Sequence, residues 1–179
     1  MDSEIKKVMV SREEIYETVK RVGREITEDY KDKRPLFVGI LKGAVPFLAD
    51  LIRVCDLDLE IDFMSVKSYG SSSKSTGEVR ILKDLDYSVQ GKDIIIVEDI
   101  IDSGYTLKYL KTNMIARGAK SVRIAAFLDK AARRVVDIDA DYVGKKIENE
   151  FIVGYGMDYA EKWRGLADIC ALKNEVYEK

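Results

Sequence analysis

Asp93-Ile94-Ile95-Ile96-Val97 is the stretch that decides the fold class of this 179-residue chain. Its four consecutive β-branched residues favour a β-strand. Residues 94–97 carry no polar side chain on either face, as in strands buried on both faces in parallel sheets covered by helices. The stretch therefore predicts an α/β fold with a mainly parallel central sheet flanked by helices.

The segments around this strand alternate between short apolar runs and helical patterns. Apolar runs at 36–40, 59–67 and 121–128 predict strands, and helices are expected at 46–52 and 106–117. An earlier helix should begin at Ser11, because Glu14 three residues later completes a capping box. Alternation of this kind predicts right-handed crossovers between parallel strands.

We expect a single domain over residues 1–179, because no linker long enough to separate two domains interrupts the chain. The stretch 70–77 is rich in serine and glycine, which predicts a flexible hairpin loop over about 68–78. Beyond Asp141 the expected elements become short. We expect them to form a small hood subdomain, mainly from about 141–179 with the N-terminal segment.

Composition excludes several classes of function. The chain has no histidine, which rules out Ser-His-Asp and Cys-His mechanisms, and its two cysteines form no C-x-x-C pair typical of zinc sites. A net charge of −2 gives no sign of a nucleic-acid-binding surface. No apolar run approaches the ~20 residues of a membrane span, and the first residues do not resemble a signal peptide. We therefore expect a cytoplasmic protein.

The residues that follow the 93–97 strand carry the strongest functional signal. Glu98 and Asp99 stand at the strand end, where open parallel sheets bind ligands, and their carboxylates suit vicinal hydroxyls or a cation. Residues 102–106 (Asp-Ser-Gly-Tyr-Thr) offer hydroxyls and backbone amides before a helix, which favours a bound phosphate. A phosphorylated sugar would satisfy both halves. The alternatives are a solvated acidic loop and, for Asp102, a simple helix N-cap.

This segment resembles the phosphoribosyl pyrophosphate signature of the type I phosphoribosyltransferases: an apolar strand, two acids, two apolar residues, Asp, Ser or Thr, Gly, any residue and Thr. Other segments resemble, in family order, motifs of the hypoxanthine-guanine branch. They are the pyrophosphate loop at 41–44, the flexible loop at 67–70 and 75–77, the purine-binding segments 128–130 and 151–159, and the arginine segment 163–166. The resemblance implies the type I phosphoribosyltransferase fold and a purine salvage enzyme.

The implied reaction displaces pyrophosphate from ribose C1 of phosphoribosyl pyrophosphate by a purine nitrogen, with Mg²⁺ as cofactor. Hypoxanthine, and guanine as a second substrate, would give IMP or GMP plus pyrophosphate. Asp102 would be the general base near purine N7, while Glu98 and Asp99 would bind the ribose hydroxyls and Mg²⁺. The residues implied to hold the phosphoribosyl group and its 5′-phosphate are Glu98, Asp99, Asp102, Ser103, Gly104, Tyr105 and Thr106.

The resemblance also implies residues for pyrophosphate and for closure of the site. Lys42, Gly43 and Arg164 would bind pyrophosphate, in a loop that often carries a non-proline cis peptide in this family. Ser68 and Tyr69 would lie on the flexible loop that closes over the reacting centre and excludes water.

The purine would be held by residues of the last third of the chain. Lys130 would donate to the 6-oxo group, which selects 6-oxopurines over adenine, although a lysine in this position could also be a surface residue. Phe151 would stack on the base, and the backbone of Ile152 would contact its other edge. Asp158 would reach a second Mg²⁺. Gly156 departs from the expected pattern, and the sequence alone offers no account of it.

Two alternatives stay open at this stage. A phosphoribosyltransferase-like regulator that binds nucleic acid would need a basic surface or an added domain, and this chain is nearly neutral. A xanthine-preferring phosphoribosyltransferase would share the same motifs. Members of the family commonly assemble, so we expect a homodimer or homotetramer.

Overall fold

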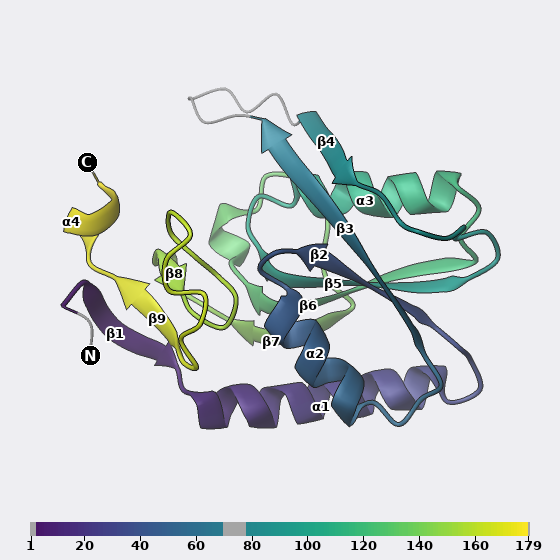
Figure 1. The fold of residues 1–179 in the computed structure, drawn as a ribbon, viewed down its shortest axis with the longest axis horizontal. Coiled ribbons are helices and arrows are strands. Elements are labelled where there is room, and N and C mark those ends of the chain that lie inside the picture. The colour runs from purple at the N-terminus through teal and green to yellow at the C-terminus, as the bar shows by residue number, and fades with distance from the viewer. Residues whose placement is uncertain (1–2, 70–77, 179) are drawn as a thin grey trace.

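The computed structural model describes residues 3–69 and 78–178 (Figure 1). A six-stranded sheet with the order β4-β3-β2-β5-β6-β7 forms its centre. The strands are β2 (Leu36–Leu41), β3 (Glu60–Tyr69), β4 (Glu78–Lys83), β5 (Asp93–Ile101), β6 (Ser121–Asp129) and β7 (Tyr142–Lys146). All neighbours are parallel except β3 and β4, which form the arms of the expected hairpin. The prediction of a mainly parallel α/β fold is confirmed.

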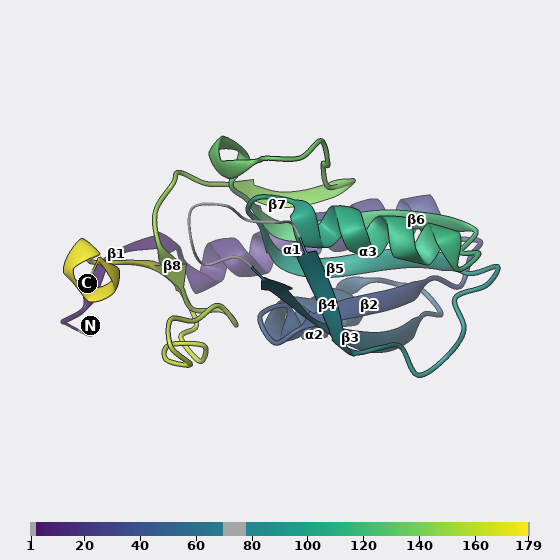
Figure 2. The same cartoon turned by 90° about the horizontal axis from the view of Figure 1, so that it is seen from above.

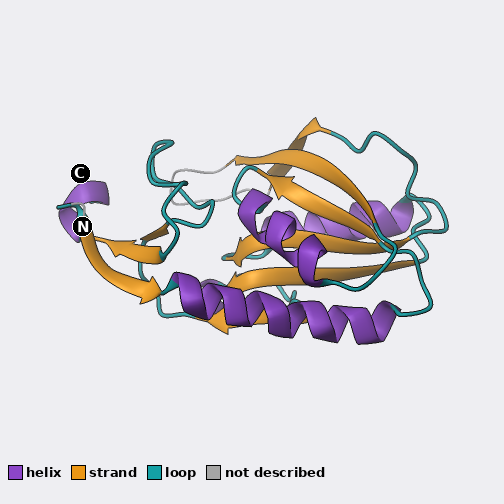
Figure 3. Ribbon diagram, turned by 60° about the horizontal axis from the view of Figure 1, so that its bottom comes forward, coloured by secondary structure: helices purple, strands orange, loops and turns teal. Residues whose placement is uncertain are grey.

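Strand β5 lies in the middle of this sheet and is buried on both faces. Ile95 and Val97 pack into the core that contains α1 (Arg12–Tyr30) and α2 (Val45–Val54). Ile94 and Ile96 pack on the opposite side against α3 (Tyr105–Ala116). Two views show these helices on the two faces of the sheet (Figure 2, Figure 3). The four β-branched residues thus pack against the helices on both faces of the sheet.

Helix α1 begins as the sequence predicts. The Ser11 hydroxyl accepts a hydrogen bond from the Glu14 backbone at 3.2 Å, and the Glu14 carboxylate accepts one from the Ser11 backbone at 2.9 Å. These two bonds satisfy amides that have no partner within the helix. Among the described residues, no helix combines the length and apolarity needed to cross a bilayer.

A smaller antiparallel sheet of order β1-β9-β8 stands at one end of the large one (Figure 1). It consists of β1 (Ile5–Val10), β8 (Ile152–Val153) and β9 (Ile169–Leu172), and the short helix α4 (Asn174–Tyr177) follows. The hood subdomain was expected to begin at about residue 141, but β7 pairs in parallel with β6 and so belongs to the large sheet. Its partial exposure is typical of an edge strand, so the sequence pattern resembled an isolated short element. We call residues 147–178 together with β1 the hood.

Candidate active site

The carboxyl ends of β5 and β6 meet the hood at a cavity of about 230 Å³. The residues that line it are Asp99, Ile100, Asp102, Lys130, Arg133, Phe151, Ile152, Met157 and Asp158. Six of these nine were predicted from the sequence as site residues. Segments more than fifty positions apart in the chain therefore converge on one space, at the sheet edge where parallel α/β folds bind ligands.

Glu98 and Asp99 stand side by side near the end of β5. The Ile100 backbone N–H donates to Asp99 Oδ1 at 2.7 Å, and the Asp99 N–H donates to Glu98 Oε1 at 3.3 Å. Burial, reinforced by the charge of Asp99, raises the pKa of Glu98 well above its usual range. Burial also raises the pKa of Asp99, against the hydrogen bonds that it accepts and the charge of Arg164. Donors from sugar hydroxyls, or a cation, would relieve this crowding of negative charge.

The turn between β2 and α2 lies directly against Asp99. A Cβ atom on Gly43 would stand 1.7 Å from Asp99 Oδ2, so only glycine permits the approach. The peptide bond between Leu41 and Lys42 is cis, as in the expected pyrophosphate loop.

The start of α3 offers unpaired backbone donors. Gly104 is the N-cap residue, with φ of 90°, and no described side chain caps this helix. The alternative reading of Asp102 as the N-cap is therefore wrong. The first-turn amides of Tyr105 and Thr106 have no partner within the helix and suit an anion. Tyr105 also lines a separate cavity, together with Val136.

Asp102 enters the cavity from the loop after β5. Arg133 Nε lies 3.0 Å from its Oδ1, although the pair is poorly aligned, and Oδ1 has no hydrogen bond from any described residue. Arg134 donates to the Asp102 backbone carbonyl at 3.1 Å and pairs with the buried carboxylate of Asp129. Neither Arg133 nor Arg134 was predicted from the sequence as a site residue. In the structure these two arginines hold the loop, and Asp102 Oδ1 is buried without a hydrogen bond from a described residue.

Lys130 is buried, with 6% of its surface exposed, so its reading as a surface residue is wrong. Its Nζ donates to the Glu150 carbonyl at 2.8 Å, and burial lowers its pKa. Phe151 stacks on Tyr177 with ring centroids 4.7 Å apart and an interplanar angle of 24°. Ile152 pairs with Ala171 in the small sheet. A planar ligand between Phe151 and the β5 loop would meet an aromatic face and an ammonium donor.

Arg164 holds the hood segment that packs on the turn after β2. Its Nη2 lies 2.8 Å from Asp158 Oδ1, and its Nη1 donates to the Gly156 carbonyl at 2.7 Å. Gly156 has φ of 98°, and a Cβ atom there would stand 2.0 Å from the Gly43 carbonyl oxygen. The glycine that the sequence left unexplained lets the hood backbone pack on the turn after β2.

Ser68 and Tyr69 lie at the end of β3, where their backbones pair with β4. Their side chains and residues 70–77 fall outside the part of the chain that the structure describes. The role of this loop stays a prediction.

The acidic residues fit Mg²⁺ only together with a substrate. Among the described residues, no three acidic, histidine or cysteine side chains form a group that could hold a metal alone. Asp158 is paired with Arg164 and is not part of the Glu98–Asp99 pair. Mg²⁺ commonly binds one or two carboxylates while phosphates and water complete its shell, and these residues could supply that number.

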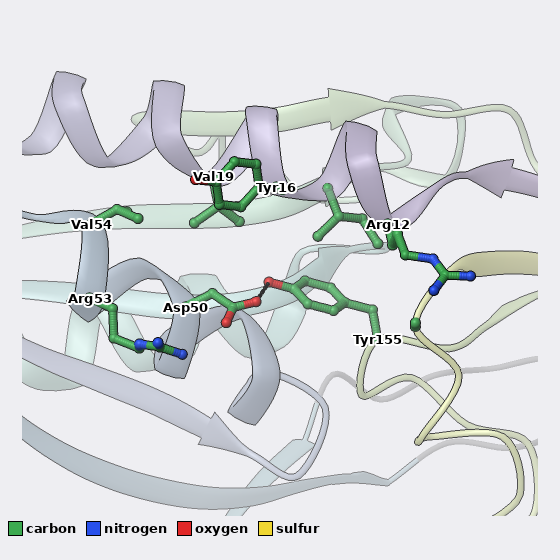
Figure 4. Close-up of a pocket in the computed structure, with 9 residues that line it drawn as sticks. Arg12, Tyr16, Val19, Asp50, Arg53, Val54 and Tyr155 are labelled. Atoms are coloured by element: carbon green, nitrogen blue, oxygen red, sulfur yellow. Dashed lines mark hydrogen bonds between the residues drawn. The ribbon is translucent and has the colours of Figure 1, made fainter.

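A second cavity of about 510 Å³ lies between α1, α2 and the hood (Figure 4). Here Tyr155 reaches across from the hood and donates its hydroxyl hydrogen to Asp50 Oδ2 at 2.8 Å. Burial and the Asp50 charge raise the pKa of Tyr155, so the phenol stays protonated. The bond fastens the segment next to Gly156 to α2.

We expect Tyr155→Phe to destabilise the protein by about 1 kcal/mol, because it leaves Asp50 without this partly buried donor. Thermal unfolding followed by circular dichroism should show a melting temperature lower by roughly 2–4 °C. Tyr16→Phe is the matched control, since Tyr16 lines the same cavity but is 59% exposed. Equal melting temperatures for both variants would contradict the anchoring role of Tyr155.

Comparison with known proteins agrees with this geometry. The Phosphoribosyl transferase domain family matches residues 11–160. The chain is 54% identical over 178 residues to hypoxanthine-guanine phosphoribosyltransferase of Bacillus subtilis (strain 168), with 99% of each protein covered. It is 53% identical to the enzyme of the same name from Streptococcus mutans, with 100% of this chain and 99% of that protein covered. A crystal structure of hypoxanthine phosphoribosyltransferase from Staphylococcus aureus matches with a TM-score of 0.96 and 46% identity over 100% of both chains. This chain belongs to the phosphoribosyltransferase family, in its hypoxanthine-guanine branch.

Proposed function

We propose that the protein transfers the 5-phosphoribosyl group from phosphoribosyl pyrophosphate to hypoxanthine and guanine, giving IMP or GMP plus pyrophosphate. The observation that carries this proposal is the cavity in which buried Lys130, the Phe151 ring and the Asp102 carboxylate converge. A 6-oxopurine needs a donor at its oxo group, an aromatic face and an acceptor for the N7 proton. These three side chains supply all of them.

The base would be held and deprotonated by the residues of this cavity. Lys130 donates to the 6-oxo group, and Phe151 stacks on the ring. Asp102 accepts the N7 proton as N9 bonds to ribose C1 and the bond from C1 to pyrophosphate breaks. Glu98 and Asp99 accept hydrogen bonds from the ribose hydroxyls, and the α3 amides bind the 5′-phosphate.

The leaving group would sit between the β2–α2 turn and the hood. Lys42, the Gly43 backbone and Arg164 neutralise pyrophosphate. Mg²⁺ held with the help of Glu98, Asp99 and Asp158 would screen the negative charge that develops on the leaving group. Ser68 and Tyr69 belong to the loop that would exclude water, which otherwise competes with the purine.

Formation of nucleotide tests the proposal. Purified protein, phosphoribosyl pyrophosphate, MgCl₂ and hypoxanthine should yield IMP, separated by anion-exchange chromatography. Omission of phosphoribosyl pyrophosphate or addition of EDTA should abolish the product. Absence of IMP from folded protein would contradict the proposal.

We expect Lys130→Ala to raise the KM for hypoxanthine and guanine about 10- to 100-fold, because a charged donor contributes about 1.5–3 kcal/mol. The initial rate with adenine should rise relative to the rates with hypoxanthine and guanine, since the 6-amino group of adenine no longer meets an ammonium. Initial rates with each base measure the change. Lys111→Ala, at a partly exposed position of α3 away from the cavity, is the control. Unchanged base selectivity would place the purine contact elsewhere.

We also propose a cytoplasmic homodimer or homotetramer. Both cysteines, Cys55 and Cys170, are free and buried, which suits a reducing compartment. The relatives named above do not favour a nucleic-acid-binding regulator or a xanthine-preferring enzyme.

A further inference from the structure

Glu161 forms ion pairs with Lys42 and Arg164, the two cationic residues that the proposed function assigns to pyrophosphate. Its Oε2 lies 3.2 Å from Lys42 Nζ and 3.3 Å from Arg164 Nε, and its Oε1 lies 3.3 Å from Arg164 Nη2. Lys42 belongs to the turn after β2, whereas Glu161 and Arg164 belong to the hood. One carboxylate therefore joins both halves of the proposed leaving-group site.

The backbone around Glu161 keeps this side chain in reach of both cations. The Glu161 N–H donates to Asp158 Oδ2 at 2.8 Å, and Asp158 pairs with Arg164. Glu161 has φ of 63°, in the left-handed region that few residues other than glycine adopt. Its side chain is nevertheless 65% exposed, so the carboxylate can leave while the backbone stays in place. Arg164 and then Lys42 hold the pKa of Glu161 below its usual value, so it is charged at neutral pH.

A carboxylate that bridges a lysine and an arginine makes the contacts that a pyrophosphate would make. We propose that Glu161 is an internal substitute for pyrophosphate. It pairs with Lys42 and Arg164 in the free protein and is displaced when phosphoribosyl pyrophosphate or pyrophosphate binds. It therefore weakens the binding of both and favours departure of the pyrophosphate product. This inference rests on the proposed function, because it takes Lys42 and Arg164 as pyrophosphate ligands.

Titration calorimetry of magnesium pyrophosphate into the protein and its Glu161→Gln variant tests the inference. The substitution removes the charge but keeps the size of the side chain and the backbone bond to Asp158. Each exposed ion pair contributes up to about 1 kcal/mol. We therefore expect the Kd of Glu161→Gln for magnesium pyrophosphate to be about three- to tenfold lower than that of the unaltered protein. The KM for phosphoribosyl pyrophosphate should fall in parallel, while the KM for hypoxanthine stays unchanged.

Glu17→Gln is the matched control, since Glu17 is an equally exposed glutamate that pairs with Lys20 on α1. Its Kd should equal that of the unaltered protein. An unchanged or higher Kd in Glu161→Gln would overturn the inference. A higher Kd would show that Glu161 only positions Lys42 and Arg164. If the unaltered protein does not bind pyrophosphate, both this inference and the assignment of Lys42 and Arg164 fail. Tighter binding in the variant, without nucleotide synthesis by the unaltered protein, would overturn the proposed reaction alone.

Discussion

Asp102→Asn lowers kcat by about 10²–10⁴-fold, the usual contribution of a general base, while the KM for phosphoribosyl pyrophosphate changes little. The amide keeps the size of the carboxylate but cannot take the N7 proton. The fold should survive, because the Asp102 side chain is 44% exposed and the bond from Arg134 goes to its backbone carbonyl. Steady-state rates of IMP formation at saturating substrates measure the loss.

Asp137→Asn is the control for this substitution, since Asp137 is exposed and lies three residues after Arg134, which binds the Asp102 loop. It should retain full turnover. Nearly full turnover in Asp102→Asn would remove Asp102 as the general base. Glu98 and Asp99 would then be the next residues to test, because their carboxylates stand near the end of β5, just before the Asp102 loop.

Gly43→Ala should lower kcat/KM for phosphoribosyl pyrophosphate by about 10²-fold or more, because displacement of a site by about 1 Å has that effect. The new methyl group would stand 1.7 Å from Asp99 Oδ2 and 2.7 Å from Asp99 Cγ. Either the Asp99 carboxylate or the turn after β2 must move. Asp99 has little room to do so, because its Oδ1 already accepts a hydrogen bond from the Ile100 backbone.

Gly165→Ala is the matched control, since a Cβ atom there meets nothing within 4 Å. This variant should keep its activity and its melting temperature. Initial rates over a range of phosphoribosyl pyrophosphate concentrations compare the two. Equal kcat/KM values for Gly43→Ala and the unaltered protein would show that the turn can yield, and that Asp99 is not placed by its contact with Gly43.

Features that depend on local sequence were predicted well. Strand β5 follows from four adjacent β-branched residues, and the start of α1 follows from Ser11 and Glu14. The loop after β5 carries acids, hydroxyls and a glycine in one short segment. Its position at a helix N-terminus could be inferred from the neighbouring elements alone.

Features that depend on contacts between distant segments could not be inferred in the same way. Burial of Lys130 depends on the hood, whose Glu150 carbonyl accepts its hydrogen bond. Gly156 is required by the carbonyl of Gly43, more than a hundred residues earlier. In the sequence Glu161 looks like an ordinary surface charge, because nothing near it indicates its ion pair with Lys42. Arg133 and Arg134 were not predicted, because their contacts with Asp102 depend on how the loop after β5 meets the segment after β6.

The comparison of kcat/KM among purine and pyrimidine bases tests the central claim most directly. Pyrophosphate release would be followed with phosphoribosyl pyrophosphate, Mg²⁺ and hypoxanthine, guanine, xanthine, adenine or uracil, each in a separate assay. The arrangement of Lys130, Phe151 and Asp102 predicts efficient turnover of hypoxanthine and guanine and very little with adenine or uracil. Turnover of adenine equal to that of hypoxanthine, or no turnover of any base by folded protein, would contradict it.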